Sequence, residues 1–203
     1  HPDSLITFTA LNGQPGGWNG ISFNSYTGPS LLKYCTIEKA QSANISVNYT
    51  SAPVFSNCLI SQSTGYGIYS WYGAYRLSNS RVVNNQNNGI FIGGNPVPTI
   101  GDTLGKGNDI FNNYQYEIYN QSTSNVYARH NFFNVPDLNT AGMRIYDNAD
   151  NPSYGIVMID PMSSSSCLAG NWFVSALARY HNNDSTAMNN VTVVLRDNLN
   201  APV

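Results

Sequence analysis

Hydrophobic and polar residues alternate along most of this chain in short segments of about three to six residues. An alternation with a period of two is typical of β-strands, whereas amphipathic helices repeat their apolar positions every three or four residues. Asn, Gly and Ser, which favour tight turns, lie between the alternating segments. The pattern therefore predicts many short strands joined by tight turns.

Two of these segments recur in alternation from the N-terminal region to about residue 135. The first has its inward positions at Cys35, Cys58, Ser80, Asn108 and His130, whose numbers differ by 23, 22, 28 and 22 in turn. The second begins with Ile21, Ile45, Ile68, Ile90 and Ile118, whose numbers differ by 24, 23, 22 and 28. Both series contain the same long step, which we attribute to an inserted loop at Gly93–Pro98 because Gly and Pro favour loops.

Strands this short cannot bury a core within one repeat, but coils stacked on one another share a continuous interior. On these repeats the chain resembles the right-handed parallel β-helix proteins of the pectate-lyase-like superfamily, over about residues 5–135. The resemblance implies an all-β solenoid with two strands in each of about five coils of ~22 residues. It implies no particular activity, because one fold hosts many functions.

The repeat breaks at about residue 131, and residues 136–147 are typical of a short helix. We therefore expect a β-helix domain over residues 1–162, closed from about residue 131 by a capping helix and a strand. Residues 163–203 form a C-terminal extension that starts with four serines and contains an alternating strand at 190–197. That strand either opens an immunoglobulin-like module, to which it is similar, or pairs back onto the domain's own sheet.

Composition adds an expected location and excludes several classes of partner. Charged residues make up 10% of the chain and the net charge is −2, while Asn is the most frequent residue type and Ser the second. Nucleic-acid binding and membrane insertion are not expected, because the chain has no Lys/Arg cluster and no apolar run of ~20 residues. We expect an extracellular or cell-surface protein without a metal or cofactor, and with Cys35, Cys58 and Cys167 as buried free thiols.

If the repeated isoleucines point inward, the residues that follow them form an outward column, because strand side chains alternate between faces. The column reads Ser22, Ser46, Tyr69, Phe91 and Tyr119. Trp71, Tyr72 and Glu117 lie beside it in sequence. Aromatic rings suit the C–H faces of sugars, so we expect these residues to form a carbohydrate-binding strip. The alternatives are that the rings only stabilise the sheet, or that a neighbouring domain covers them.

The acidic residues define the alternative to binding, which is a polysaccharide lyase or a glycoside hydrolase. Asp109 lies one coil from Arg81, where we expect an exposed salt bridge, and Asp102 and Lys106 lie near it in sequence. The repeat places no second carboxylate beside Glu117 for hydrolysis, so no catalytic residue is assigned. We therefore expect a polysaccharide-binding or cell-wall-binding module next to other domains of a longer chain. The third possibility is a structural stalk or adhesin segment.

Overall fold

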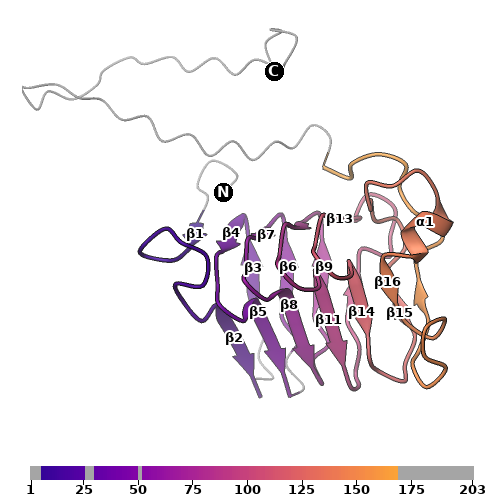
Figure 1. The fold of residues 1–203 in the computed structure, drawn as a ribbon, viewed down its shortest axis with the longest axis horizontal. Coiled ribbons are helices and arrows are strands. Elements are labelled where there is room, and N and C mark those ends of the chain that lie inside the picture. The colour runs from indigo at the N-terminus through magenta and orange to yellow at the C-terminus, as the bar shows by residue number, and fades with distance from the viewer. Residues whose placement is uncertain (1–5, 26–29, 50–51, 169–203) are drawn as a thin grey trace, which may run out of the picture. The chain divides into compact units, whose positions relative to one another are not determined.

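The computed structural model describes residues 6–25, 30–49 and 52–168, which form a solenoid of three parallel β-sheets (Figure 1). The first sheet contains β1 (Ile6–Phe8), β4 (Cys35–Glu38), β7 (Leu59–Ser61), β10 (Arg81–Val83) and β13 (Asp109–Phe111). The second contains β2 (Ile21–Asn24), β5 (Ala43–Asn48), β8 (Tyr66–Trp71), β11 (Ile90–Gly93), β14 (Ile118–Asn120) and β16 (Ile145–Tyr146). The third contains β3 (Leu31–Lys33), β6 (Val54–Ser56), β9 (Arg76–Ser78), β12 (Thr99–Ile100), β15 (Val126–Tyr127) and β17 (Val157–Met158).

The column of isoleucines predicted from the spacing is confirmed. Ile21, Ile45, Ile68, Ile90 and Ile118 are opposite one another in successive strands of the second sheet. From Ile45 onward these side chains are buried in the core, and Ile145 of β16 adds a further member. The expected all-β solenoid of about five stacked coils is therefore correct.

Each coil contains three strands, whereas two were expected. The first sequence pattern crosses a corner between the third and first sheets, where a single residue adopts a positive φ. This corner residue is Tyr34, Asn57, Asn79 or His130 in different coils, with φ between 48° and 61°. A bend of one residue barely interrupts the run of apolar positions, so the alternation alone did not reveal it.

His130 and the inserted loop also differ from expectation. Asp109 bridges Phe132, so Asn131, rather than His130, is opposite Asn108 and occupies the inward position, while His130 turns the corner. Five of the six extra residues of the long coil lie between β12 and β13, and only one lies between β11 and β12, where the loop at Gly93–Pro98 was expected to hold them all. Equivalent residues of β9 and β10 are five positions apart, whereas those of β12 and β13 are ten apart.

Buried asparagines connect the coils at two corners and account for much of the asparagine content. The side-chain oxygen of Asn85 accepts the backbone N–H of Ser63 at 3.1 Å, and that of Asn113 accepts the N–H of Asn85 at 3.2 Å. At another corner the oxygen of Asn131 accepts the N–H of Asn108 at 2.8 Å. These amides satisfy backbone groups that the tight turns leave without strand partners.

The C-terminal end of the stack is covered by α1 (Leu138–Gly142) and the segments around it (Figure 1). The Asp137 carboxylate caps α1 by accepting the backbone N–H of Thr140 at 2.9 Å. The helix is shorter than the expected 136–147, because Ile145–Tyr146 pairs with β14 as another strand of the second sheet. None of the described helices is long and apolar enough to span a bilayer.

Only the beginning of the C-terminal extension is described. Ser166 and Cys167 hydrogen-bond to Asp109 of β13, so this part of the extension lies against the solenoid. Residues 169–203, which include the expected strand at 190–197, lie outside the described residues.

Substitution of Asn85 tests whether the amides hold the coils together. We expect Asn85→Ala to lower the free energy of unfolding by about 2–4 kcal/mol, because several buried polar groups lose their partner together. Urea unfolding followed by circular dichroism measures this loss. Gln86→Ala, at the exposed next position, is the matched control and should change stability by less than about 0.5 kcal/mol.

Removal of the Tyr75 hydroxyl is expected to stabilise the protein, in contrast to the loss of the Asn85 amide. Tyr75 is 1% exposed, its ring packs against Phe55, and its hydroxyl oxygen has no hydrogen-bond partner among the described residues. Tyr75→Phe removes this unsatisfied group and keeps the ring, so it should raise the free energy of unfolding by about 1 kcal/mol. A decrease in the thermal unfolding midpoint would show that the hydroxyl has a partner after all.

Candidate functional site

The outer face of the second sheet carries a continuous aromatic stack, formed by Tyr69, Phe91, Tyr119 and Tyr146. These residues are opposite one another on β8, β11, β14 and β16. Their ring centroids are separated by 5.0, 5.4 and 4.5 Å in turn, and the planes of neighbouring rings are inclined by 3°, 26° and 4°. The in-register parallel strands set this spacing, because neighbouring strands lie ~4.8 Å apart.

Tyr146 was missed from the sequence because its segment was assigned to the capping helix. The signal was nevertheless present, since Ile145-Tyr146 repeats the pair Ile118-Tyr119 of the preceding strand. Recognising that pair as a further repeat would have extended the expected column by one residue.

Further aromatic residues flank the stack. The Trp71 ring lies parallel to Tyr69 within 7°, at 6.5 Å between centroids, and Tyr66 packs at 5.4 Å from Tyr69. Trp71 lies across Gly93, where any Cβ would collide with the indole ring. Tyr72 lies in the same way over Gly94 and is exposed. The structure therefore brings together all five aromatic residues predicted for the site.

The rings of the stack cover one another's faces. Phe91 is only 8% exposed, while Tyr69, Tyr119 and Tyr146 are half-buried. A ligand on this surface would therefore meet mainly ring edges and phenol groups, and Phe91 would serve to hold the stack together. Burial raises the pKa of the Tyr69 and Tyr119 phenols, so both are neutral hydrogen-bonding groups near neutral pH.

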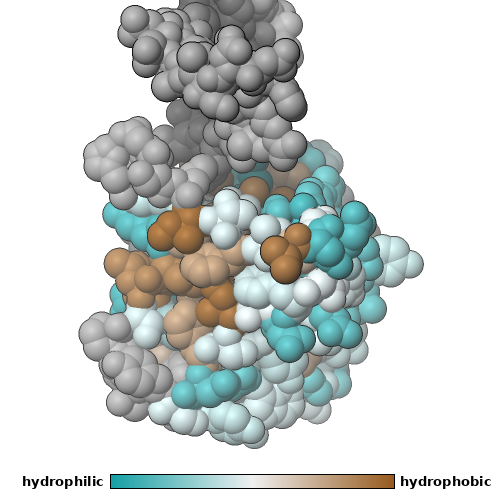
Figure 2. Space-filling model, turned by 90° about the vertical axis from the view of Figure 1, so that its left-hand side faces the viewer, coloured by the Kyte–Doolittle hydropathy of each residue, from teal (hydrophilic) through white to brown (hydrophobic). Residues whose placement is uncertain are grey.

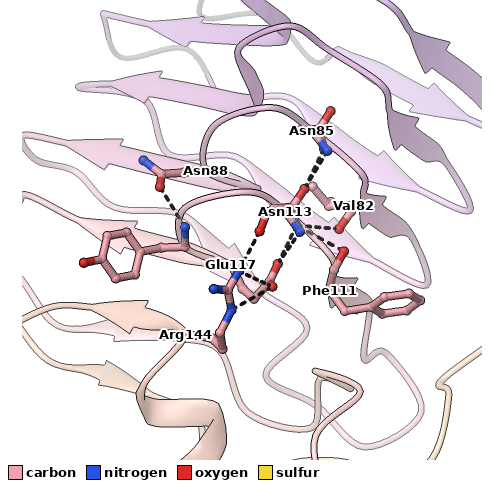
Figure 3. Close-up of polar contacts among 8 residues, drawn as sticks. Val82, Asn85, Asn88, Phe111, Asn113, Glu117 and Arg144 are labelled. Carbon is pink, nitrogen blue, oxygen red and sulfur yellow. Dashed lines mark hydrogen bonds and ion pairs between the residues drawn. The ribbon is translucent and has the colours of Figure 1, made fainter.

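The structure corrects the expectation that Glu117 lies on the binding surface. Glu117 is 2% exposed, and its carboxylate turns inward to Asn113, the last member of the series of stacked asparagines Asn85 and Asn113, called the asparagine series below (Figure 3). One carboxylate oxygen accepts the backbone N–H of Asn113 at 3.3 Å, and the other pairs with Arg144 at 3.1 Å. Burial raises the pKa of Glu117, although Asn113 and Arg144 act in the opposite direction.

The other acidic candidates are also held by arginines. The expected bridge between Asp109 and Arg81 is present at 2.8 Å, but Asp109 is buried rather than exposed, because Ser166 and Cys167 cover it. Asp102 pairs instead with Arg129, at 2.6 Å. The expected group of Asp102, Lys106 and Asp109 therefore does not form, because Asp102 and Asp109 belong to two separate ion pairs and Lys106 to neither of them. Within the described residues, no three side chains are placed to hold a metal ion.

The cysteines are free thiols in the described structure, as expected. Cys35 and Cys58 occupy matching inward positions in neighbouring coils, and burial raises the pKa of Cys58 to about 12. Cys167 is half-buried beside a pocket that Leu104, His130 and Pro161 also line. Its thiol donates to the backbone carbonyl of His130 at 3.2 Å, and burial raises its pKa. Each thiol is therefore protonated near neutral pH and is a poor nucleophile.

Comparison with known proteins agrees with this architecture. A family model described as "Right handed beta helix region" matches residues 6–104. The chain is a right-handed β-helix repeat protein. The β-helix continues in the structure beyond the matched residues, from β13 to β17. Neither the curated proteins nor the solved structures gave a match.

The raised pKa of Glu117 predicts a pH dependence of stability. Its contribution is fully present below the ordinary glutamate pKa of 4.5 and is lost as the pH rises through the raised value. The stability of Glu117→Gln relative to the parent should therefore increase from about pH 4 to about pH 8. Urea unfolding at a series of pH values measures this difference. A constant difference across the range would show that the carboxylate is not shifted upward in the folded state.

Proposed function

We propose that this β-helix binds polysaccharide chains along the outer face of its second sheet. The observation that carries the proposal is the aromatic stack, in which Tyr69, Phe91, Tyr119 and Tyr146 follow one another on successive strands and the three tyrosines are partly exposed. Such a line of rings suits a polymer, because the exposed tyrosines lie across several coils and can contact different sugar units of one chain. An extracellular or cell-surface location belongs to this proposal and is supported by the low charge and the abundance of neutral polar residues.

The chemistry of the surface favours an uncharged glycan. The phenols are neutral, and exposed amides continue the same sheet beyond the aromatic residues, where Asn48 donates to Asn24 at 2.9 Å. The Glu117 carboxylate is buried and already paired with Arg144. The Asp147 carboxylate, next to Tyr146 in sequence, is also buried and accepts the backbone N–H groups of Ala149 and Val157. Sugar hydroxyls would therefore find donors and acceptors here without an opposing charge.

A structural role is the second candidate, and the mutual stacking of the rings favours it. Phe91 contacts Tyr69, Tyr119 and other rings on its flanks while exposing little surface. Such contacts stabilise neighbouring strands whether or not a ligand binds. For a polysaccharide lyase or hydrolase, the remaining candidate, the carboxylates considered from the sequence were Asp102, Asp109 and Glu117, and each of these is paired with an arginine.

Affinity electrophoresis in gels containing neutral or acidic polysaccharides tests the binding proposal. The parent should be retarded by at least one neutral glycan. The triple variant Tyr69→Phe, Tyr119→Phe and Tyr146→Phe should lose most of this retardation, because it keeps the stacked rings and removes the phenol groups. Tyr127→Phe is the matched control, since Tyr127 is an exposed tyrosine on the third sheet.

Other results would favour the other candidates. If no polysaccharide retards the parent while Tyr119→Ala lowers its thermal midpoint, the rings serve stability and the structural role replaces binding. Unsaturated products that absorb in the ultraviolet would instead show a lyase, and new reducing ends without that absorbance would show a hydrolase. Circular dichroism on each variant separates loss of binding from loss of fold.

A further inference from the structure

At the N-terminal end of the β-helix, apolar core positions are exposed within the described part of the chain. Figure 2 faces this end and shows apolar residues gathered on it among more polar neighbours. Ile6, which is opposite the buried Cys35, is 55% exposed, and Leu31, on the outward side of β3, is 63% exposed. Phe23 and Leu32 are only partly buried, although both pack against the core. A set of core positions therefore reaches the surface at this end.

The same positions are covered one coil further along. The register pairs Ile6 with Cys35, Phe8 with Ile37, Ile21 with Ile45, Phe23 with Val47, and Leu32 with Phe55. Every second member of these pairs is at most 3% exposed. The difference arises because a further layer of strands covers the second member on its N-terminal side and none of the described residues does so for the first. The interior pattern of the solenoid thus extends to its last layer.

The backbone of this end is also open to pairing. β1, β2 and β3 are the outermost strands of the three sheets and have one strand neighbour each among the described residues. Of their ten residues, only Lys33 is charged. Exposed edge strands are usually protected by charges, prolines or bulges. These edges carry almost none of that protection.

We propose that this end is a docking surface for a further β-helical coil, which adds one parallel strand to each of β1, β2 and β3. The argument rests on continuity with the coil-to-coil contacts already present, because all three sheets end at the same face and in the same parallel register. A coil winding in the same direction continues all three ladders together. A second copy facing this end would run its strands in the opposite direction.

Grafting one of the protein's own coils onto this end tests the proposal. Residues 1–5 are replaced by a copy of residues 58–79, which contains one strand of each sheet and ends, like the natural corner, on a residue with positive φ. In the matched control, the copied coil carries Ile60→Asp, Ile68→Asp and Leu77→Asp at its three inward apolar positions. The unmodified chain of 203 residues is the reference. Thermal unfolding, binding of the hydrophobic dye ANS and light scattering are measured on all three proteins.

We expect the reference to be a monomer that binds ANS, because the described residues leave its N-terminal apolar positions exposed. The graft should reduce ANS fluorescence at least about twofold and raise the unfolding midpoint by about 5 °C or more, whereas the control should do neither. Equal midpoints for graft and control would overturn the proposal. So would a reference dimer that Leu31→Lys dissociates, which would make a second copy the occupant. An increase in ANS binding on deletion of residues 169–203 would make that segment the occupant, and would also overturn it.

Discussion

In-register parallel pairing between successive coils is the constraint on which the rest of this structure depends. Each strand is only two to six residues long and could not persist alone. When the strands stack in register, equivalent positions of successive coils lie above one another. Similar residues at one position of the repeat therefore form a column along the solenoid. The isoleucine interior, the aromatic stack and the asparagine series are three such columns, facing inward, outward and along the corners.

The scarcity of charge is consistent with this arrangement. A column of like charges at ~4.8 Å spacing would repel itself along its whole length, whereas columns of amides, rings or aliphatic groups attract. Two of the buried acids among the described residues pair with an arginine one coil away, Asp109 with Arg81 and Glu117 with Arg144, and the third, Asp147, accepts backbone N–H groups. Low charge, first noted as a mark of an extracellular protein, is therefore also what a solenoid of stacked identical positions requires.

Spacing alone predicted the columns that repeat once per coil, because the period fixes which residues stack. It did not predict the corners, because a left-handed residue such as Tyr34 or Asn79 turns the chain while leaving little trace in the apolar pattern. It also placed Glu117 on the surface. That residue is buried because Arg144 and Asn113 meet it there, and Arg144 lies in a segment that was read as helix. The aromatic surface could be predicted from the repeats. The structure of the C-terminal end of the solenoid could not, because it depends on contacts such as that of Arg144 with Glu117, which do not recur from coil to coil.

The hydrogen bonds of the asparagine series all point the same way along the solenoid. Each side-chain oxygen accepts a backbone N–H from the preceding coil, so the backbone N–H of each asparagine needs an acceptor from the following coil. Asp109 bridges Phe132, so the position four residues after Phe132, which is Pro136, corresponds to Asn113 in the next coil. Because Pro136 has no side-chain acceptor, the Glu117 carboxylate accepts the backbone N–H of Asn113 instead. The Glu117 carboxylate thus ends the asparagine series near the C-terminal end of the described solenoid. Such a chain can therefore be lengthened without disturbing this terminus by adding repeats within the stack or at its opposite end.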